Sequence, residues 1–169
     1  TSTCDPKDRT NIITAGNFHL LPQRVFTVGR LDKDSTGLIL LTSDGRLNNA
    51  LLRPSASKEK VYEVRLSKPP TDDDIEQLRS GVRILTTVQK ERGGTKEISV
   101  TTLPCRVRRI GRRSAQQNPM LEFTLVEGRN RQIRKMCEAL GHRVIDLHRT
   151  KFSSIGLRGL AENQWAELT

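Results

Sequence analysis

Asp32 is a residue whose type and setting could do chemistry. It stands in "TVGRLDKDSTGLILLTSDG", between a basic residue and a run of aliphatic residues. An aspartate here is a turn residue, a helix cap or a nucleophile, and the local pattern leaves all three open. Asp34 and Asp44 fit the turn role better, because each lies beside serine, threonine or glycine. A hydrolytic carboxylate pair of Asp32 with Asp34 has no third feature to support it.

Arginines gather in the second half of the chain, where their number predicts phosphate binding. Acidic residues are scarce there, and only Glu122 and Glu127 interrupt the basic stretch. Guanidinium groups bind phosphate through two hydrogen bonds at once, and "EGRNRQ" precedes a predicted helix whose N-terminus favours an anion. The basic residues of this stretch are Arg106, Arg108, Arg109, Arg112, Arg113, Arg129, Arg131, Arg134 and Lys135.

The composition of the 169 residues favours a nucleic-acid partner. The net charge is +10 and the hydrophobic fraction is 34%, which indicates a globular protein that meets a polyanion, with a membrane surface the weaker alternative. One Trp, one Tyr and four Phe are too few for stacking along a single strand. Backbone recognition of folded RNA, or extrusion of one base, fits better. The longest apolar run, Leu38 to Leu41, is far too short to span a membrane.

The cysteines predict neither a disulfide framework nor a metal site. Cys4, Cys105 and Cys137 lie far apart, and their number is odd. The three histidines do not cluster with them in a ligand motif. We therefore expect free thiols in a reducing compartment.

The elements around Asp32 are predicted from short-range patterns. "VGRLD" is typical of a short strand that leads into a loop, and "GLILL" of a buried strand that ends at the Asp44–Gly45 turn. The apolar spacing in "RLNNALL" predicts a short helix after that turn. If "GRLD" is extended, Arg30 and Asp32 point the same way.

The rest of the chain alternates between strand and helix patterns. "KVYEVRL" predicts a strand with Tyr62 on its buried face. "TDDDIEQLRSGV" predicts a helix with Thr71 as N-cap, Asp74 in a capping box and Gly81 at the stop. Apolar residues at helical spacing in "NRQIRKMCEALG" predict a second helix, which Gly141 ends. Further strands are expected in "EISVTTLPCRVRRIG", "MLEFTLVEG", "RVIDLHRT" and "NQWAEL". The fold class is α+β, with a mixed, mainly antiparallel sheet and a few flanking helices.

Three motifs resemble those of the pseudouridine synthases. "GRLDKDSTGLILLTSDGRL" resembles the catalytic motif of that family, and "KEKVYEVRL" resembles the motif that carries its tyrosine. "EGRNRQIRKMCEALGHRVIDLHRTKF" is similar to the C-terminal motif of the RsuA/RluB/RluE/RluF branch, with most resemblance to the RluF/RluE-type large-subunit rRNA enzymes. The motifs stand in the family order, and with the segments between them they cover most of the chain.

The resemblance implies an isomerase that converts a specific uridine of ribosomal RNA to pseudouridine, in a central RNA-binding cleft and without metal or cofactor. Asp32 would act on the sugar, as nucleophile at C1′ or as base at C2′. Tyr62 would pack on the uracil and help to remove the C5 proton. Arg134, in "QIR", would be the cation beside Asp32.

The resemblance also implies a set of RNA contacts. Arg30 would enter the stack that the flipped uridine leaves. The other expected contacts are Lys33, Arg129, Asn130, Arg131, Gln132 and Lys135. Two alternatives remain: a non-catalytic RNA-binding ribosome-assembly factor on the same fold, and a basic protein-interaction module.

Relatives of this kind begin with an S4-like RNA-binding domain and a strand reading "NKPxG", and this chain starts after both. We therefore expect residues 1–169 to form one N-terminally incomplete catalytic domain without an S4-like domain. The expected partner is ribosomal RNA, in a structured stem-loop or a pre-ribosomal particle. We expect a monomer without a membrane partner. The expected location is the cytoplasm, or an organelle matrix or stroma if a targeting segment precedes the chain.

Overall fold

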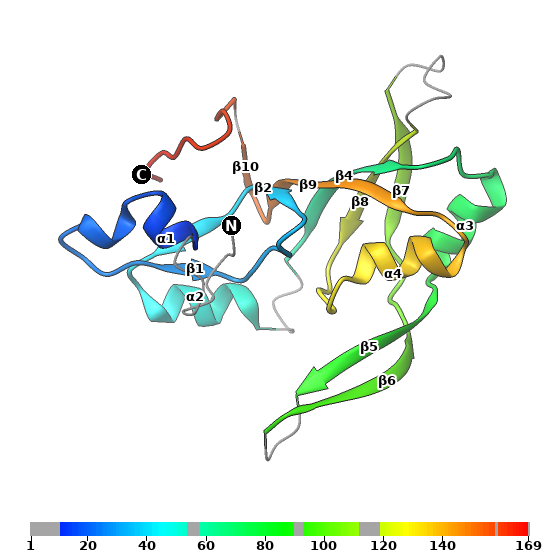
Figure 1. Cartoon of the computed structure of the whole chain (residues 1–169), viewed down its shortest axis with the longest axis horizontal. Coiled ribbons are helices and arrows are strands. Elements are labelled where there is room, and N and C mark those ends of the chain that lie inside the picture. Colours follow the sequence, from blue (N-terminus) through cyan, green and yellow to red (C-terminus); the bar gives the residue numbers. More distant parts are fainter. Residues whose placement is uncertain (1–10, 54–57, 90–92, 112–118, 158, 169) are drawn as a thin grey trace.

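The chain forms two lobes (Figure 1). The computed structural model describes residues 11–53, 58–89, 93–111, 119–157 and 159–168. In the first lobe two short strands pair antiparallel, and Val28, Leu38 and Leu40 form a small core with Phe152 from the other end of the chain. The elements of this lobe are α1 (Ile12–Ala15), the 3-10 helix η1 (Phe18–Leu20), β1 (Phe26–Val28), β3 (Leu40–Thr42) and α2 (Gly45–Leu52).

The second lobe is built on a six-stranded sheet. Its strand order is β10-β9-β4-β8-β7, and β2 joins beside β9. Every pairing is antiparallel except that of β2 with β9. This confirms the α+β class with a mixed, mainly antiparallel sheet. The strands are β2 (Thr36–Gly37), β4 (Lys60–Leu66), β7 (Arg106–Ile110), β8 (Met120–Leu125), β9 (Val144–Phe152) and β10 (Ile155–Gly156).

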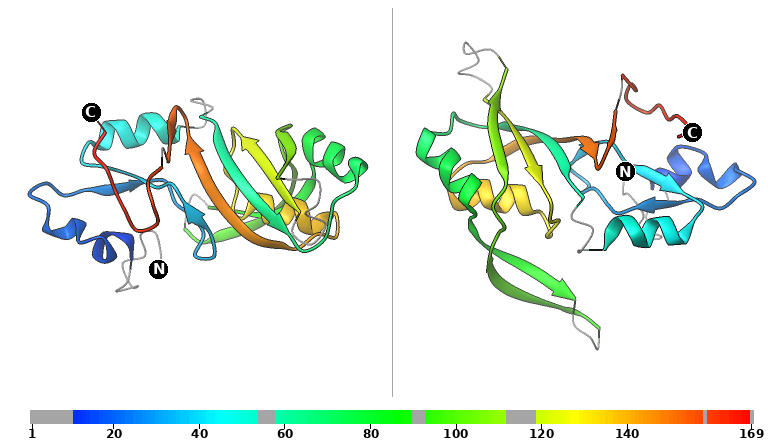
Figure 2. Two further views of the ribbon diagram at one scale, coloured as in Figure 1. Left: turned by 90° about the horizontal axis from the view of Figure 1, so that it is seen from above. Right: turned by 180° about the vertical axis from the view of Figure 1, so that it is seen from behind.

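Two helices, α3 (Asp72–Ser80) and α4 (Gln132–Ala139), cover one face of this sheet (Figures 1 and 2). Alternate strand residues such as Val64 and Phe123, both 0% exposed, point into the shared core. Leu78 of α3 and Met136 of α4 meet them there. The predicted stripe of α4 is confirmed, since Ile133, Met136 and Cys137 are all buried.

The ends of these helices follow the sequence signals. Thr71 and Asp74 form both hydrogen bonds of the capping box at the start of α3, and Gly81 follows its last residue. Gly141 adopts a φ of +75° just after α4, a conformation that glycine takes without strain. The His142 ring then bonds Asp74 at 3.0 Å, which ties the end of α4 to the start of α3.

A two-stranded hairpin projects from the second lobe (Figure 1). It consists of β5 (Arg83–Gln89) and β6 (Thr95–Thr101). Its inner face, with Ile84 and Thr86, is buried, and its outer face exposes Leu85. The strand-like stretch predicted after residue 96 is therefore two strands, because the chain bends at Pro104 between β6 and β7.

Three local predictions were wrong or incomplete. "NQWAEL" is not a strand but irregular chain, whose Trp165 packs edge-on against Phe18 of the first lobe. The strand at "VGRLD" ends at Val28, because Gly29 turns the chain at a φ of +74°. "GLILL" belongs to two strands, since β2 pairs with β9 while β3 pairs with β1. Within the described residues, no helix is long and apolar enough to cross a membrane.

Candidate active site

Asp32 lies in a tight turn between the two lobes. The Ser35 amide donates to the Asp32 carbonyl at 2.9 Å, which closes the turn over Lys33 and Asp34. The first lobe holds the turn through β1, and the second holds it through the parallel pairing of β2 with β9. The Asp32 side chain is 30% exposed, so a substrate can reach its carboxylate.

Close backbone packing anchors the turn on β9. A Cβ atom on Gly37 would lie 2.3 Å from the Arg149 carbonyl oxygen, and Gly37 itself has a φ of +103°. The Arg149 Nε donates to the Leu38 carbonyl at 2.8 Å, and the Leu38 amide donates to the Arg149 carbonyl at 2.7 Å. Only glycine fits at position 37, and Arg149 is therefore part of the scaffold that holds Asp32.

Arg131 provides the guanidinium next to Asp32. Its Nη1 lies 3.9 Å from the Asp32 carboxylate. The same guanidinium donates two hydrogen bonds to Asp34, each at 2.8 Å. These bonds hold the pKa of Asp34 below its usual value, and the nearby charges of Arg134 and Arg131 act in the same direction. Arg131 thus spans two carboxylates from one turn.

Arg134 contacts the turn through Asp34. Its Nη2 donates to the Asp34 carbonyl at 2.6 Å, its Nε lies 3.4 Å from the Asp34 carboxylate, and its side chain is only 12% exposed. Its Nη1 also donates to the Val144 carbonyl on β9, at 3.4 Å. The resemblance led us to expect Arg134 beside Asp32. In the structure Arg134 binds Asp34 instead, and Arg131 is the arginine nearer to Asp32.

The loop before α4 is braced from within. Gln132 is 4% exposed, and its amide accepts from the Arg129 backbone and donates to Glu127. Arg129 Nε also bonds Glu127, at 2.9 Å. Asn130 is exposed and accepts from Lys135. Both polar groups of Gln132 are thus occupied inside the protein, where they hold the loop in shape.

Tyr62 lies two strands away from the Asp32 turn. On β4 it stands opposite Phe123 of β8 on one side and Arg149 of β9 on the other. Arg149 in turn stands opposite Gly37 of β2. Strands lie about 4.8 Å apart, so roughly 10 Å of sheet separates Tyr62 from Gly37. The ring is half-buried against the core, on the face that the alternation of "KVYEVRL" predicts.

Arg30 and Lys33, two of the predicted RNA contacts, lie beside Asp32 in sequence and are both exposed. Within the described residues, neither side chain has a hydrogen bond or an ion pair. We predicted that Arg30 and Asp32 point the same way if "GRLD" is extended. Strand β1 ends at Val28, before this stretch, so that condition is not met by the strand.

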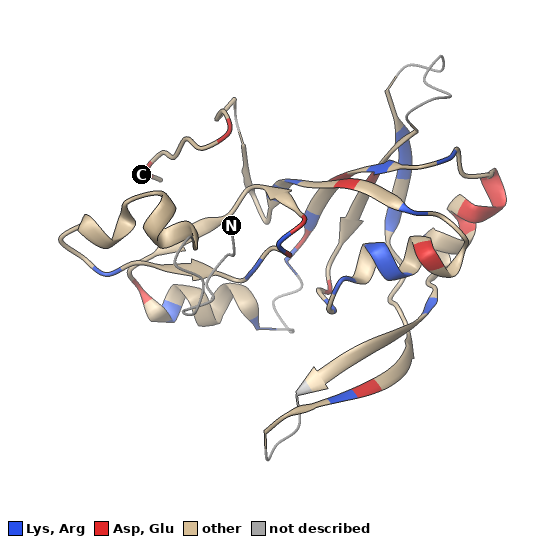
Figure 3. Cartoon of the chain, in the orientation of Figure 1, with Lys and Arg blue, Asp and Glu red and all other residues tan. Residues whose placement is uncertain are grey.

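The arginine-rich stretch carries less unbalanced charge than its sequence predicts. Arg106 pairs with Glu59, Arg108 with Glu122 and Arg109 with Asp72. Glu122 is one of the acids counted within the stretch, whereas Glu59 and Asp72 are distant in sequence, and the count of local acids could not foresee them. Figure 3 shows these charges on β7 and at the start of α3. Arg112 and Arg113 lie outside the described residues.

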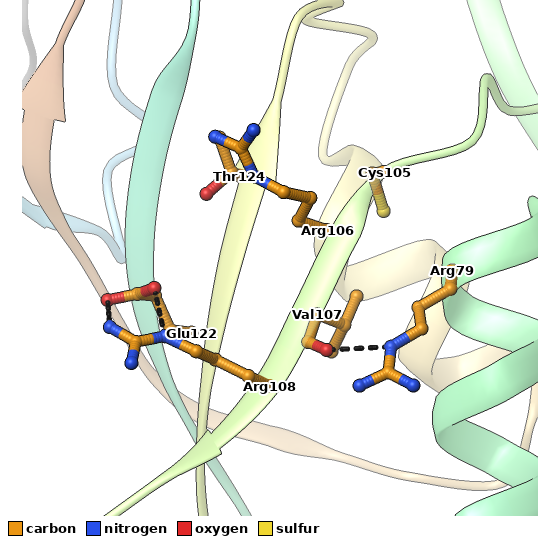
Figure 4. A pocket seen from close by; sticks show the side chains of 7 residues that line it. All are labelled: Arg79, Cys105, Arg106, Val107, Arg108, Glu122 and Thr124. Atoms are coloured by element: carbon orange, nitrogen blue, oxygen red, sulfur yellow. Dashed lines mark hydrogen bonds and ion pairs between the residues drawn. The ribbon is translucent and has the colours of Figure 1, made fainter.

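A first hollow, of about 340 Å³, illustrates this pairing (Figure 4). It lies over β7 and β8, and Arg79, Arg106 and Arg108 line it. Figure 4 shows Arg108 bound to Glu122 by two hydrogen bonds and Arg79 bound to the Val107 carbonyl. Each arginine of this hollow is thus bound to a carboxylate or to a backbone carbonyl.

Comparison with known proteins identifies the class to which this fold and turn belong. The family model for RNA pseudouridylate synthase matches residues 2–139, and the chain belongs to this family. The dual-specificity RNA pseudouridine synthase RluF of Salmonella typhi is 39% identical over 99% of this chain and 50% of its own length. The ribosomal large subunit pseudouridine synthase B of Bacillus subtilis is 34% identical over 96% of this chain and 61% of its own.

Solved structures agree with this assignment. A crystal structure of a pseudouridylate synthase superposes with a TM-score of 0.66 and 32% identity, over 86% of this chain and 56% of that one. The human RNA pseudouridylate synthase domain containing 1 has the same fold at 15% identity and a TM-score of 0.56, over 84% of this chain and 68% of its own. The chain spans about half the length of the RluF relatives it matches.

Proposed function

We propose that the protein is an rRNA pseudouridine synthase, with Asp32 as the carboxylate that acts on the target uridine. The observation that carries the proposal is the position of Asp32. Its accessible carboxylate lies in a turn that two lobes hold, 3.9 Å from a guanidinium. Relatives at 34–39% identity are named as RNA or large-subunit pseudouridine synthases, which supports rRNA as the substrate.

The reaction exchanges one bond of the uridine for another. The N1–C1′ bond breaks, the base turns, and a C5–C1′ bond forms, while C5 loses a proton and N1 gains one. No electron is lost or gained overall. Asp32 acts directly on the sugar, by attack at C1′ or by removing the C2′ proton. The buried uridine of a stem must first leave the helical stack, which costs a few kcal/mol.

The neighbouring side chains have distinct parts in this proposal. Arg131 keeps a positive charge beside the Asp32 carboxylate. Arg134 positions the turn through the Asp34 carbonyl. Tyr62 packs on the displaced uracil and assists proton removal at C5. Arg30, Lys33, Arg129, Asn130, Arg131 and Lys135 contact the RNA, and Gln132 supports their loop.

Residues 1–169 act in this proposal as the catalytic domain. The partner is ribosomal RNA, in a stem-loop or a pre-ribosomal particle, and the protein acts as a monomer, which sedimentation tests. The relatives described above come from bacteria, and this supports a cytoplasmic site of action.

Substitution of Asp32 tests the proposal. Asp32→Asn keeps the shape of the side chain and removes its charge. We expect pseudouridine formation in an rRNA transcript to fall by a factor on the order of 10⁴ or below detection. The assay is mass spectrometry of nuclease digests. Asp73→Asn, an exposed acid on α3, is the matched control and should retain activity. Pseudouridine at the wild-type rate in Asp32→Asn would exclude Asp32 as the catalytic group.

A further inference from the structure

A second hollow, of about 420 Å³, lies beside α4, next to the Asp32 turn. We call it the α4 hollow. Its volume falls in the range of about 300–1,000 Å³ that is usual for ligand sites. Three arginines contribute to its wall and one carboxylate opposes them. The residues that matter here are Arg131, Arg134, Glu138, Gly141, His142 and Arg143.

The α4 hollow is continuous with the candidate active site. Arg131 and Arg134 line it, and the same two side chains bind the Asp34 part of the turn. A nucleotide next to a uridine placed at Asp32 would lie within reach of this wall. The opposite side of the hollow, where Arg143 lies, has no part in the proposed catalysis.

Two cationic side chains on that far side, Arg143 and Lys68, have no role in the proposed reaction or in the contacts that hold the turn. Arg143 is exposed, and its guanidinium has no hydrogen bond or ion pair within the described residues. Lys68, which follows β4, reaches the same place, since its Nζ lies 3.8 Å from where a Cβ on Gly141 would be. The two come from different elements, so the fold itself gathers positive charge at this rim.

The charge balance distinguishes the α4 hollow from the hollow over β7 and β8. There the arginine side chains are bound to carboxylates or to a backbone carbonyl. Here Glu138 is the acid in the wall, and within the described residues the side chains of Arg143 and Lys68 have no hydrogen bond or ion pair. An arginine whose fork is open binds a phosphate through two parallel hydrogen bonds. Two unpaired cations near two arginines therefore suit a phosphodiester.

We infer that the α4 hollow is a phosphate subsite for the RNA backbone beside the target uridine, with Arg143 and Lys68 as its phosphate ligands. This inference rests on the proposed function for the identity of the ligand as RNA. A second explanation is purely structural: both cations lie near the C-terminal end of α4, where the helix dipole attracts positive charge. The two explanations predict different measurements.

The experiment measures RNA binding against salt for Arg143→Gln, Lys68→Gln and the double variant. The probe is a bacterial large-subunit rRNA transcript, and Arg24→Gln in the first lobe is the control for loss of one exposed charge. Each single variant should raise Kd about threefold and reduce the slope of log Kd against log salt by about 0.7–0.9. The double variant should raise Kd about tenfold, and Arg24→Gln should change neither quantity.

The same samples separate the possible failures. If Arg143→Gln and Lys68→Gln lower the free energy of unfolding but leave Kd and its slope at the wild-type values, the cations serve only the helix end and the subsite is overturned. If all three charge removals, Arg24→Gln included, weaken binding alike, the effect is general electrostatics and the subsite is again overturned. If the variants bind as expected but the wild type makes no pseudouridine in the transcript, the subsite stands and the proposed isomerase activity falls.

Discussion

At the scale of single residues, the site depends on which charges the turn presents. Asp32 offers an accessible carboxylate, and Asp34 takes both hydrogen bonds of Arg131. Exposed ion pairs of this kind stabilise a fold by less than about 1 kcal/mol, because solvent screens them and ordering two side chains costs entropy. The pair can therefore open when an RNA phosphate approaches Arg131.

A double-mutant cycle on this pair tests that view. Arg131→Gln and Asp34→Asn, alone and together, should give a coupling free energy below about 1 kcal/mol in urea unfolding. A coupling well above this would mean that the pair is a fixed part of the fold. Arg131 would then be unavailable to the substrate.

The cysteines give a second prediction at this scale. Burial raises the pKa of Cys105 to about 11 and that of Cys137 to about 12, so roughly one thiol in a thousand or fewer is ionised at pH 8. In a Cys4→Ser variant, iodoacetamide at pH 8 should leave the native protein almost unmodified. Both thiols should react fully in urea. Rapid alkylation of the native protein, measured by mass spectrometry, would contradict the raised pKa values of the two thiols.

At the scale of elements, two joints hold the site together. One is the parallel pairing of β2 with β9, where Gly37 meets the Arg149 backbone. The other joins the start of α3 to the end of α4 through Asp74 and His142. In each joint the two partners are distant in sequence and in contact in space. One substitution at either partner can therefore test the contact.

Gly37→Ala should disrupt the first joint. The new methyl group would sit 2.3 Å from a carbonyl oxygen at a φ of +103°, so overlap and backbone strain both act. We expect a loss of roughly 3 kcal/mol or more in the free energy of unfolding. Gly93→Ala is the control, since it has a positive φ and nothing within 4 Å, and it should lose about 1 kcal/mol. Equal losses in urea titrations would contradict the close packing.

Asp74→Asn should weaken the second joint in a pH-dependent way. Hydrogen bonds from the Thr71 backbone and from His142 lower the pKa of Asp74 from 3.8 to about 2. Because the folded pKa lies below the unfolded one, this stabilisation is complete above about pH 4 and is lost as pH falls towards 2. At pH 7 the variant should be roughly 1–2 kcal/mol less stable.

The control for this joint is Asp73→Asn, the neighbouring acid on α3, which is exposed. It should change stability by much less at every pH. The stability gap between wild type and Asp74→Asn should narrow when urea unfolding is repeated at pH 4, 3 and 2.5. A gap that stays constant would show that the charge of Asp74 is not what holds the joint.

At the scale of the whole molecule, the net charge of +10 governs how the protein meets RNA. Arg106, Arg108 and Arg109 pair with acids at the surface, while other exposed cations, such as Arg24 in the first lobe and Arg143 beside the α4 hollow, have no partner within the described residues. The fold therefore leaves only part of its positive charge available to RNA. Binding should remain electrostatic but involve fewer phosphates than the number of basic residues.

Salt dependence of RNA binding measures this number of phosphates. With five charged contacts proposed around the turn and two more at the α4 hollow, the Kd for an rRNA transcript should rise by roughly a hundredfold or more between 50 and 200 mM salt. Fluorescence anisotropy over this range gives the slope directly. A flat response would remove the role of the cations in RNA binding, whatever the fate of the catalytic proposal.

The sequence by itself determined the local features of this protein. Strand alternation placed Tyr62 on a half-buried face, and the capping box of α3 and the glycine after α4 were readable because each depends on a few neighbouring residues. The motif around Asp32 predicted the family, which the comparisons confirmed. The sequence also predicted that Asp34 is a turn residue, and Lys33 and Asp34 do form a turn.

Only the tertiary structure decided which charges meet. Arg131 and Asp34 stand 97 residues apart in the chain, and Arg108 meets Glu122 across two strands. The pairing of an arginine depends on which groups the fold brings within about 4 Å, and local composition carries no such information. For the same reason the scaffold role of Arg149 and the cationic rim at Arg143 were not visible until β9 was placed beside the Asp32 turn.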